Sequence, residues 1–337
     1  MSDDLLTETA NRLFAATCTT EVVEAAERDG WCATVWDAVA EAGFPWVGVP
    51  EDSGGSGGSF EDAAALLRAA GRAAAPIPLA ETGVLGGWLL ASAGLELPDG
   101  PVAVVPGPVQ LGQAATVAWG RAAERIVGLV DDGGTTLVVA ARADQVEVDP
   151  GRNLAGEPRD DVRITARLGE LDAAPAPDGV DAAALWRRGA LTRVVMAAGA
   201  LEAMTDLTVE YTHQRRQFGK PVATFQAVQQ HLVTVAQATA RLAMAADVAC
   251  RAVARGDGEL QVAAAKILLD DAVEQATRSA HQAHGAMGVT REYPLHHVSR
   301  RLWAWRHEYG GARSWRAALG TTLVDRGADE LFLAVTG

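Results

Sequence analysis

The sequence predicts an α+β protein that is mostly α-helical, with an N-terminal helical domain, a middle β-sheet domain and a C-terminal four-helix bundle. Two observations lead to this fold class. Apolar residues recur at helical spacing at both ends of the 337-residue chain, and short β-branched runs fill the middle. A chain of this length can bury two or three such layers. We place the domains at residues 1–99, 100–179 and 180–337.

The first domain is expected to contain helices separated by one marked interruption. Helical spacing stops at Phe44–Pro50, where proline and glycine are unfavourable for a helix. After a glycine-rich turn, Ser59 is placed to cap a new helix that begins at Phe60, with Asp62 as its capping partner. The glycine run lacks the GxxxxGK[ST] pattern, so it does not predict a phosphate-binding loop.

The middle domain is expected to be a small antiparallel sheet that ends at Asp178-Gly179. Gly, Pro and Asp separate its β-branched runs, as is typical of turns between short strands. Four runs predict strands: Val102–Val105, Arg125–Val130, Thr135–Ala140 and Val162–Thr165.

The C-terminal domain is expected to be a bundle of long antiparallel helices with short connections. Apolar residues keep one helical face throughout this region. We expect one helix to end near Gln214, a second to follow Phe225, a third to run from Gly258 to His284, and a last one to run from Tyr293-Pro294 to Gly310-Gly311.

Composition excludes several classes of partner. The net charge of -14 argues against a nucleic-acid backbone or an anionic membrane as the main partner. No window reaches the roughly 18 consecutive apolar residues of a membrane span, and the acidic start fits no export signal, so a cytoplasmic protein is expected. Cys18, Cys32 and Cys250 are scattered without a CxxC, which indicates buried thiols rather than disulfides or a metal site.

A basic turn between two predicted helices carries the strongest functional signal. It reads Arg215-Arg216-Gln217-Phe218-Gly219-Lys220-Pro221. Arginine offers a planar fork of donors to phosphate oxygens, so this turn is suited to a diphosphate, with Phe218 against a ring and Gln217 or Gln226 hydrogen-bonded to the ligand. The alternative is an ordinary basic turn with Phe218 in the core, and spacing alone favours that alternative.

The same segment resembles the acyl-CoA dehydrogenase signature, in which R-x-[QT]-F-G-[KR] leads into a helix that begins with F-Q. Two further blocks resemble this family and occur in the right order. Trp46–Glu51 with Gly54–Gly57 is similar to its G-x-x-V-P-E-x-x-G-G-x-G stretch, and Gln282–Pro294 is similar to its Q-x-x-G-G-x-G segment. The three blocks span most of the chain and imply the family's helix–sheet–helix fold.

The resemblance implies an FAD site that lies across a subunit boundary. In such enzymes one subunit's sheet domain holds the flavin ring, while the neighbour's turn and Gln-x-x-Gly-Gly segment hold the pyrophosphate and adenosine. By motif position, the neighbour-type contacts in this chain are Arg215, Gln217, Phe218, Gln282, Gly285 and Ala286. Gly285 is expected to allow close backbone approach to the phosphates, and Ala286 replaces the second glycine of the motif.

The flavin-ring side of the family pattern is missing. Neither a T-E-P-x-A-G-S-D-like loop nor a K-x-[WY]-I-[ST]-like strand occurs in region 102–121, and Trp119 is expected to be a packing residue. The reaction needs a carboxylate over the thioester Cα, but the family's two positions for it fall on Tyr309 and Thr192. Glu308 is the candidate base, although one residue along a helix rotates a side chain by roughly 100°. The alternative is a solvated carboxylate at a helix end.

These features together favour a degenerate partner subunit. Resemblance to bacterial heterotetrameric α2β2 acyl-CoA dehydrogenases, some of which act on steroid side chains, implies a homologous catalytic subunit, an acyl-CoA substrate and an electron-transfer flavoprotein or similar acceptor. A self-sufficient homo-oligomer with Glu308 as base and a non-catalytic scaffold are the alternatives. No metal site is expected, because the adjacent His296 and His297 should point to different sides of a helix.

Overall fold

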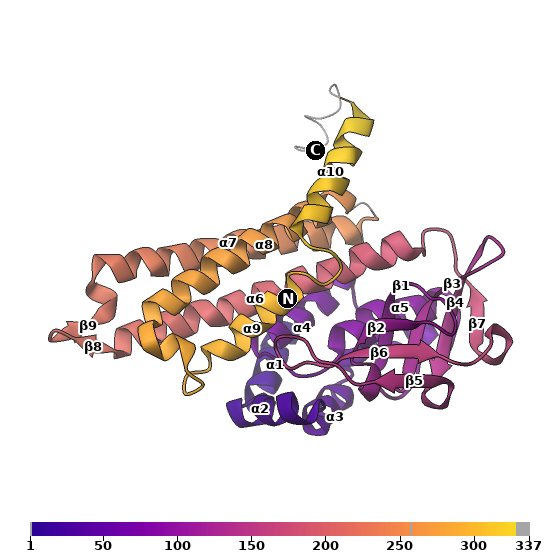
Figure 1. Ribbon diagram of the computed structural model, residues 1–337, viewed down its shortest axis with the longest axis horizontal. Helices are drawn as coiled ribbons and strands as arrows, with labels where there is room; N and C mark the ends of the chain where they lie inside the picture. Colours follow the sequence, from indigo (N-terminus) through magenta and orange to yellow (C-terminus); the bar gives the residue numbers. More distant parts are fainter. Residues whose placement is uncertain (1, 257, 328–337) are drawn as a thin grey trace.

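The computed structural model of the protein describes residues 2–256 and 258–327. The predicted fold class is confirmed: N-terminal helices are followed by strands and then by a helical bundle (Figure 1). In Figure 1 the bundle lies across the upper part of the view, with the N-terminal helices below it and the sheets at the lower right.

The N-terminal region consists of short helices: α1 (Ser2–Thr17), α2 (Thr20–Asp29), α3 (Ala33–Glu41), α4 (Phe60–Arg72), a π-helical segment (Ala80–Gly87) and α5 (Trp88–Ser92). The predicted cap of α4 is confirmed. The Ser59 hydroxyl accepts from the Asp62 amide at 3.1 Å, and the Asp62 carboxylate accepts from the Ser59 amide at 2.7 Å. These two bonds satisfy donors that the first turn of a helix otherwise leaves free.

Two sheets follow. One has the strand order β1 (Val102–Pro108), β3 (Arg125–Asp132), β4 (Thr135–Arg142) and β7 (Asp172–Pro175); the other has the order β2 (Ala114–Ala118), β6 (Arg159–Ile164) and β5 (Val146–Asp149). The prediction of an antiparallel sheet is wrong at one pair, because β1 and β3 run parallel. The chain between them leaves for the second sheet as β2 and re-enters the first sheet in the same direction.

The first sheet is buried on both faces. Along β1, Val102 and Val104 pack into the main core with the helices, whereas Ala103 and Val105 pack into a smaller core between the sheets. Successive side chains of a strand point to opposite faces, so a strand covered on both sides reads as a continuous apolar run. This explains why the β1 sequence shows no polar alternation.

The bundle contains α6 (Ala182–Gln214), α7 (Gln226–Ala254), α8 (Glu259–His284) and α9 (Leu295–Trp305), and α10 (Ala312–Arg326) projects beyond it (Figure 1). One described helix, α7, has the length and apolar composition of a membrane-crossing helix, and 28% of its most apolar 18-residue window is buried in this chain. A bundle helix with one apolar face left open passes the same test, so this feature is weak evidence for a membrane.

Candidate functional site

The basic turn forms a small hairpin at one tip of the bundle. Its strands are β8 (Arg216–Gln217) and β9 (Lys220–Pro221), which extend beyond the end of α6 (Figure 1). The Arg215 amide donates to the Tyr211 carbonyl at 2.8 Å, and the Arg215 carbonyl accepts from the Val222 amide at 2.8 Å. Two backbone bonds therefore fix the base of the hairpin, while its side chains stay exposed.

Phe218 is not a core residue. It is 91% exposed and has a φ of 51°, in the left-handed region that a residue with a bulky side chain seldom adopts. The alternative that placed Phe218 in the core of an ordinary turn is therefore wrong. The ring of Phe225 lies edge-on at 6.1 Å between centroids, and Lys220 lies over Phe225.

The second predicted segment lies at the same end of the bundle. Aromatic packing joins the end of α6 to the end of α8, because the Tyr211 and His284 rings stack at 4.5 Å between centroids. Tyr293 packs on both rings, and its hydroxyl donates to the Leu207 carbonyl at 2.9 Å. All six predicted FAD contacts are exposed at this end: Arg215, Gln217, Phe218, Gln282, Gly285 and Ala286.

Gly285 ends α8 in a backbone conformation that favours glycine. Its φ is 60° and its ψ is -137°, a combination that side chains with a Cβ essentially never adopt. A Cβ at this position would meet nothing within 4 Å, so the surrounding space is open. Gly285 also begins a short 3-10 helix (Gly285–Val289), which contains Ala286 and carries the chain toward α9.

These exposed residues fit the ADP part of FAD. Arg215 forms no ion pair with any described residue, so its guanidinium is free for phosphate oxygens. Phe218 offers a bare ring face, and Gly285 presents backbone without a side chain. The predicted contacts are therefore brought together and left open at one end of the bundle.

Glu308 lies in a network of buried charges. The Arg193 Nε donates to its Oε2 at 2.6 Å, and Arg159 donates to its Oε1. Arg193 also donates to Glu81, and the side chains of Arg193 and Glu81 are 2% and 3% exposed. The four residues come from the N-terminal region, strand β6, helix α6 and the turn after α9.

The alternative of a solvated Glu308 carboxylate is wrong, because the side chain is 16% exposed. Burial on its own raises the pKa of Glu308, but the charges and hydrogen bonds of Arg159 and Arg193 outweigh burial and lower the pKa to about 2. A general base works best when its pKa is near the operating pH. In this geometry Glu308 is a structural ion-pair partner and a weak base.

His296 and His297 lie together, contrary to the prediction. Their ring centroids are 3.9 Å apart. Both occupy the first turn of α9, where the His296 ring turns back to the Tyr293 carbonyl, with Nδ1 at 3.0 Å from that oxygen. This local hydrogen bond overrides the outward direction that helical spacing alone would give.

Comparison with known proteins settles the family. The chain matches the descriptions "Acyl-CoA dehydrogenase, N-terminal domain" over residues 2–96 and "Acyl-CoA dehydrogenase, C-terminal domain" over residues 183–330. Acyl-CoA dehydrogenase IpdE2 of Mycobacterium tuberculosis is 30% identical over 313 residues, which cover 87% of this chain and 88% of the relative. The chain belongs to the acyl-CoA dehydrogenase family.

Two further comparisons describe its relatives. Acyl-CoA dehydrogenase FadE34 of M. tuberculosis is 33% identical over 313 residues, and the match covers 87% of this chain but 42% of FadE34, so the chain spans less than half of that relative. The crystal structure of the ChsE4-ChsE5 complex from M. tuberculosis contains a chain with the same fold, at a TM-score of 0.83 and 22% identity, covering 97% of this chain and 98% of that one.

In this acyl-CoA dehydrogenase homologue, neither family position for the base carries a carboxylate. Tyr309 is buried, with a φ of 54°, and its ring fills the space beside Gly189, where an added Cβ would lie 2.3 Å from a ring carbon. Thr192 is 1% exposed and donates to the Gly189 carbonyl at 2.7 Å. Both side chains therefore contribute to packing.

Sequence reasoning missed the cations around Glu308. Arg159 and Arg193 carry no motif, and their partners lie more than a hundred residues away in the chain. Lys266 is 1% exposed and donates to the Trp305 and Arg306 carbonyls at 3.2 and 3.0 Å, which caps the end of α9. The one sequence signal for a buried charge in α6 was Arg193 itself, which stands among apolar residues of that helix.

Proposed function

We propose that this chain is the partner subunit of a heteromeric acyl-CoA dehydrogenase, with an α2β2 assembly. It contributes the ADP side of an FAD site, and a homologous catalytic subunit contributes the flavin-ring side and the base. The observation that carries the proposal is a contrast within one chain. Six predicted FAD contacts are exposed at one end of the bundle, whereas Glu308 is enclosed by arginines.

The open end of the bundle is costly for an isolated chain. Burial of a phenylalanine side chain is worth about 1.5–3 kcal/mol, and Phe218 is 91% exposed. Val289, in the second segment, is 79% exposed. A ligand and a neighbouring subunit that cover this end would recover that free energy, as expected for a site completed between two chains.

The closed network argues against an acyl site in this chain. A substrate carbon to be deprotonated needs a carboxylate within hydrogen-bonding reach, about 2.6–3.2 Å or one water away. The Glu308 oxygens already accept from Arg159 and Arg193, and Tyr309 fills the neighbouring space. The acyl-CoA thioester, including a bulky one such as a steroid side chain, is therefore assigned to the catalytic partner.

An exposed apolar stripe on α7 supports contact with another bundle. Val233, Met244 and Val248 are 54%, 68% and 41% exposed. At 100° per residue these three positions fall within about 60° of one another around the helix. Exposed apolar stripes of this kind mark protein interfaces. We assign the stripe to contact with the homologous subunit. We also propose that the complex lies in the cytoplasm and that an electron-transfer flavoprotein or similar acceptor reoxidises the reduced flavin.

The decisive experiment is purification of the chain alone and co-purified with a longer homologue that carries the missing flavin-ring and glutamate motifs. The complex should hold one FAD per heterodimer and reduce a dye with acyl-CoA, and the chain alone should do neither. Stoichiometric FAD with acyl-CoA-driven dye reduction by the chain alone would overturn the proposal in favour of a self-sufficient homo-oligomer.

A matched pair of variants tests the role of the basic turn. Arg215→Ala in the complex should lower FAD affinity by about tenfold to a hundredfold, since one charge-assisted hydrogen bond is worth roughly 1.5–3 kcal/mol. Arg255→Ala, an exposed arginine at the other end of α7, is the control and should retain FAD. Equal FAD content in both complexes would favour a non-catalytic scaffold.

A further inference from the structure

A second cluster of polar side chains lies where the N-terminal region meets the bundle, between α2 and the start of α9. One carboxylate oxygen of Glu24 and one ring nitrogen each of His296 and His297 lie within 4.8 Å of one another. Glu24 comes from α2 and the two histidines from the first turn of α9. This set of two imidazoles and one carboxylate is a donor set that Zn²⁺ prefers.

The remaining ring nitrogens fix the tautomer of each histidine. His297 Nδ1 lies 3.2 Å from Glu27 Oε1, and His296 Nδ1 lies 3.0 Å from the Tyr293 carbonyl oxygen. A carboxylate and a carbonyl only accept, so both Nδ1 atoms carry the hydrogen. In each ring Nε2 is then the nitrogen left for a metal, as in metal-binding histidines whose other nitrogen donates to a carboxylate or carbonyl.

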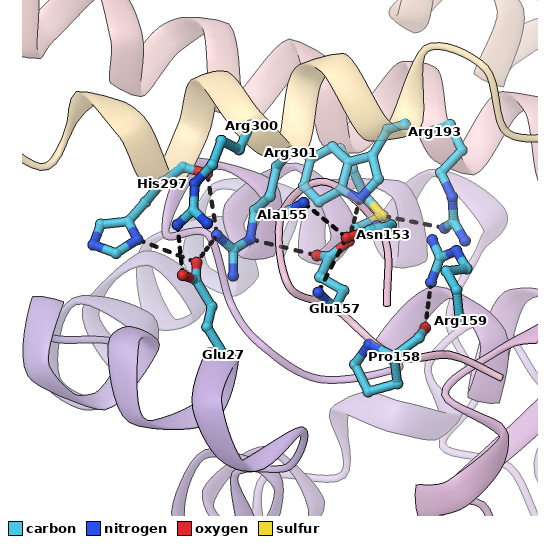
Figure 2. Close-up of polar contacts among 12 residues, drawn as sticks. Glu27, Asn153, Ala155, Glu157, Pro158, Arg159, Arg193, His297, Arg300 and Arg301 are labelled. Atoms are coloured by element: carbon cyan, nitrogen blue, oxygen red, sulfur yellow. Dashed lines mark hydrogen bonds and ion pairs between the residues drawn. The ribbon is translucent and has the colours of Figure 1, made fainter. Parts of the chain in front are cut away.

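His297 Nε2 supplies an independent indication. His297 is 4% exposed, and its Nε2 is buried without a hydrogen-bond partner among the described residues. Figure 2 shows that this nitrogen faces away from Glu27. A buried polar atom left unpaired costs about 1–3 kcal/mol, which a ligand at this nitrogen would remove.

The carboxylates of the cluster divide into two roles. Glu27 accepts from Arg300 at 2.5 Å and from Arg301 at 2.9 Å, so its charge is balanced within the chain (Figure 2). Glu24 forms no ion pair within 4.0 Å in the described part of the chain. Glu24 is therefore the carboxylate that is available for a cation, and Glu27 is the outer partner that orients His297.

We propose that Glu24, His296 and His297 bind a zinc ion that links α2 to α9. With Zn–N and Zn–O distances of about 2.0–2.2 Å, tetrahedral ligands lie roughly 3.4 Å apart. The present separations are up to 4.8 Å, so the ligand atoms must move closer together, and the half-buried side chains of Glu24 and His296 have room to adjust. A water completes the fourth position, and the ion holds the N-terminal region on the bundle.

Zinc binding to the purified full-length chain tests this directly. Equilibrium dialysis with Zn²⁺ alone, followed by metal analysis, should give one ion per chain. Co²⁺ in place of Zn²⁺ should give the visible absorption of a four-coordinate site with nitrogen and oxygen ligands. Glu24→Gln, His296→Gln and His297→Gln should each lower affinity at least tenfold, since loss of even an outer partner costs about 10–100-fold.

His231→Gln on α7 is the matched control, because His231 is a half-buried histidine outside the cluster. It should bind zinc as the unaltered chain does. Circular dichroism shows which variants fold; if buried His297→Gln does not, the half-buried Glu24 and His296 variants decide the result. Absence of stoichiometric zinc in the unaltered chain, or undiminished binding by the Glu24 and His296 variants, would overturn the proposal.

Discussion

Glu308→Gln separates a structural role of this residue from a catalytic one. The substitution keeps the shape of the side chain and one acceptor oxygen but removes the charge. Arg159 and Arg193 then lose their shared counter-ion, while Arg193 keeps Glu81. Removal of one partner from a buried ion pair is destabilising because the other charge remains buried and unpaired.

The expected magnitude follows from the pKa of Glu308. The pKa falls from 4.5 to about 2 in the folded protein, and each pKa unit corresponds to about 1.4 kcal/mol. Glu308→Gln should therefore lower the free energy of unfolding by about 3 kcal/mol near neutral pH. Because the folded pKa is depressed, this contribution is complete above about pH 4.5 and is lost as the pH falls through about 2.

Denaturant unfolding at about pH 7 and about pH 3 measures both parts of the prediction. The difference in unfolding free energy between the unaltered chain and Glu308→Gln should be largest at neutral pH and should shrink in acid. Glu96→Gln is the matched control, because Glu96 is exposed and forms no ion pair with a described residue. Its unfolding free energy should stay within about 0.5 kcal/mol of the unaltered chain.

A second measurement on the same variant concerns activity. In the complex with the catalytic subunit, turnover should fall only in proportion to the folded fraction. In the unfolding experiment, a decrease in the free energy of unfolding of about 1 kcal/mol or less at neutral pH would refute the structural role. A difference in unfolding free energy that does not shrink in acid would refute it as well. Abolished turnover in a fully folded complex would identify Glu308 as the base.

Three further predictions concern other parts of the chain. Burial lowers the pKa of Lys266 to about 7. The free energy of unfolding should therefore rise with pH between about 7 and 10.5, by up to ~1.4 kcal/mol per pH unit. In denaturant titrations, Lys266→Met should remove this rise. Phe218→Ala should leave the stability of the isolated chain within about 0.5 kcal/mol, because the side chain is 91% exposed, yet weaken FAD retention measured in the complex. Ser59→Ala should lower the free energy of unfolding by about 1 kcal/mol, because it removes the acceptor for the Asp62 amide. Denaturant unfolding measures this loss, and Ser53→Ala, the control, should change the free energy little.

The elements that follow from local sequence were predictable. The third bundle helix was expected from Gly258 to His284 and is observed at Glu259–His284. The four β-branched runs are all strands, and Ser59 caps α4. In each case propensity, periodicity and capping act within a few residues of one another, so the sequence alone contains the information.

The strand pairing and the charge networks were not predictable in the same way. Strand β2 (Ala114–Ala118) is alanine-rich, carries no strong β signal, and pairs with β6 across more than forty residues. Its departure to the second sheet is what makes β1 and β3 parallel. Arg193 lies in an apolar stretch of helix and pairs with Glu81 and Glu308, which are 112 and 115 residues away in the chain. Apolar periodicity does not predict such long-range ion pairs.

The long-range charges also explain how the three regions of the chain are joined. One network links the N-terminal region, strand β6 and the bundle through Glu81, Arg159, Arg193 and Glu308. A second links α2, the loop before β6 and α9 through Glu27, Arg301 and Glu157 (Figure 2). Glu157 also accepts from the Trp305 indole at 2.9 Å.

Apolar periodicity identifies each region but not the way the regions dock, because buried ion pairs stabilise only when every partner is in place. The pKa values of Glu27 and Glu308 are both lowered to about 2, because their partners outweigh the effect of burial: His297 and two arginines for Glu27, and Arg159 and Arg193 for Glu308. Acid therefore protonates a key carboxylate in both networks over the same pH range. The exposed end of the bundle with the predicted FAD contacts and the closed Glu308 site therefore both depend on these ion pairs. The sequence shows which residues are charged, but it does not show which of them pair.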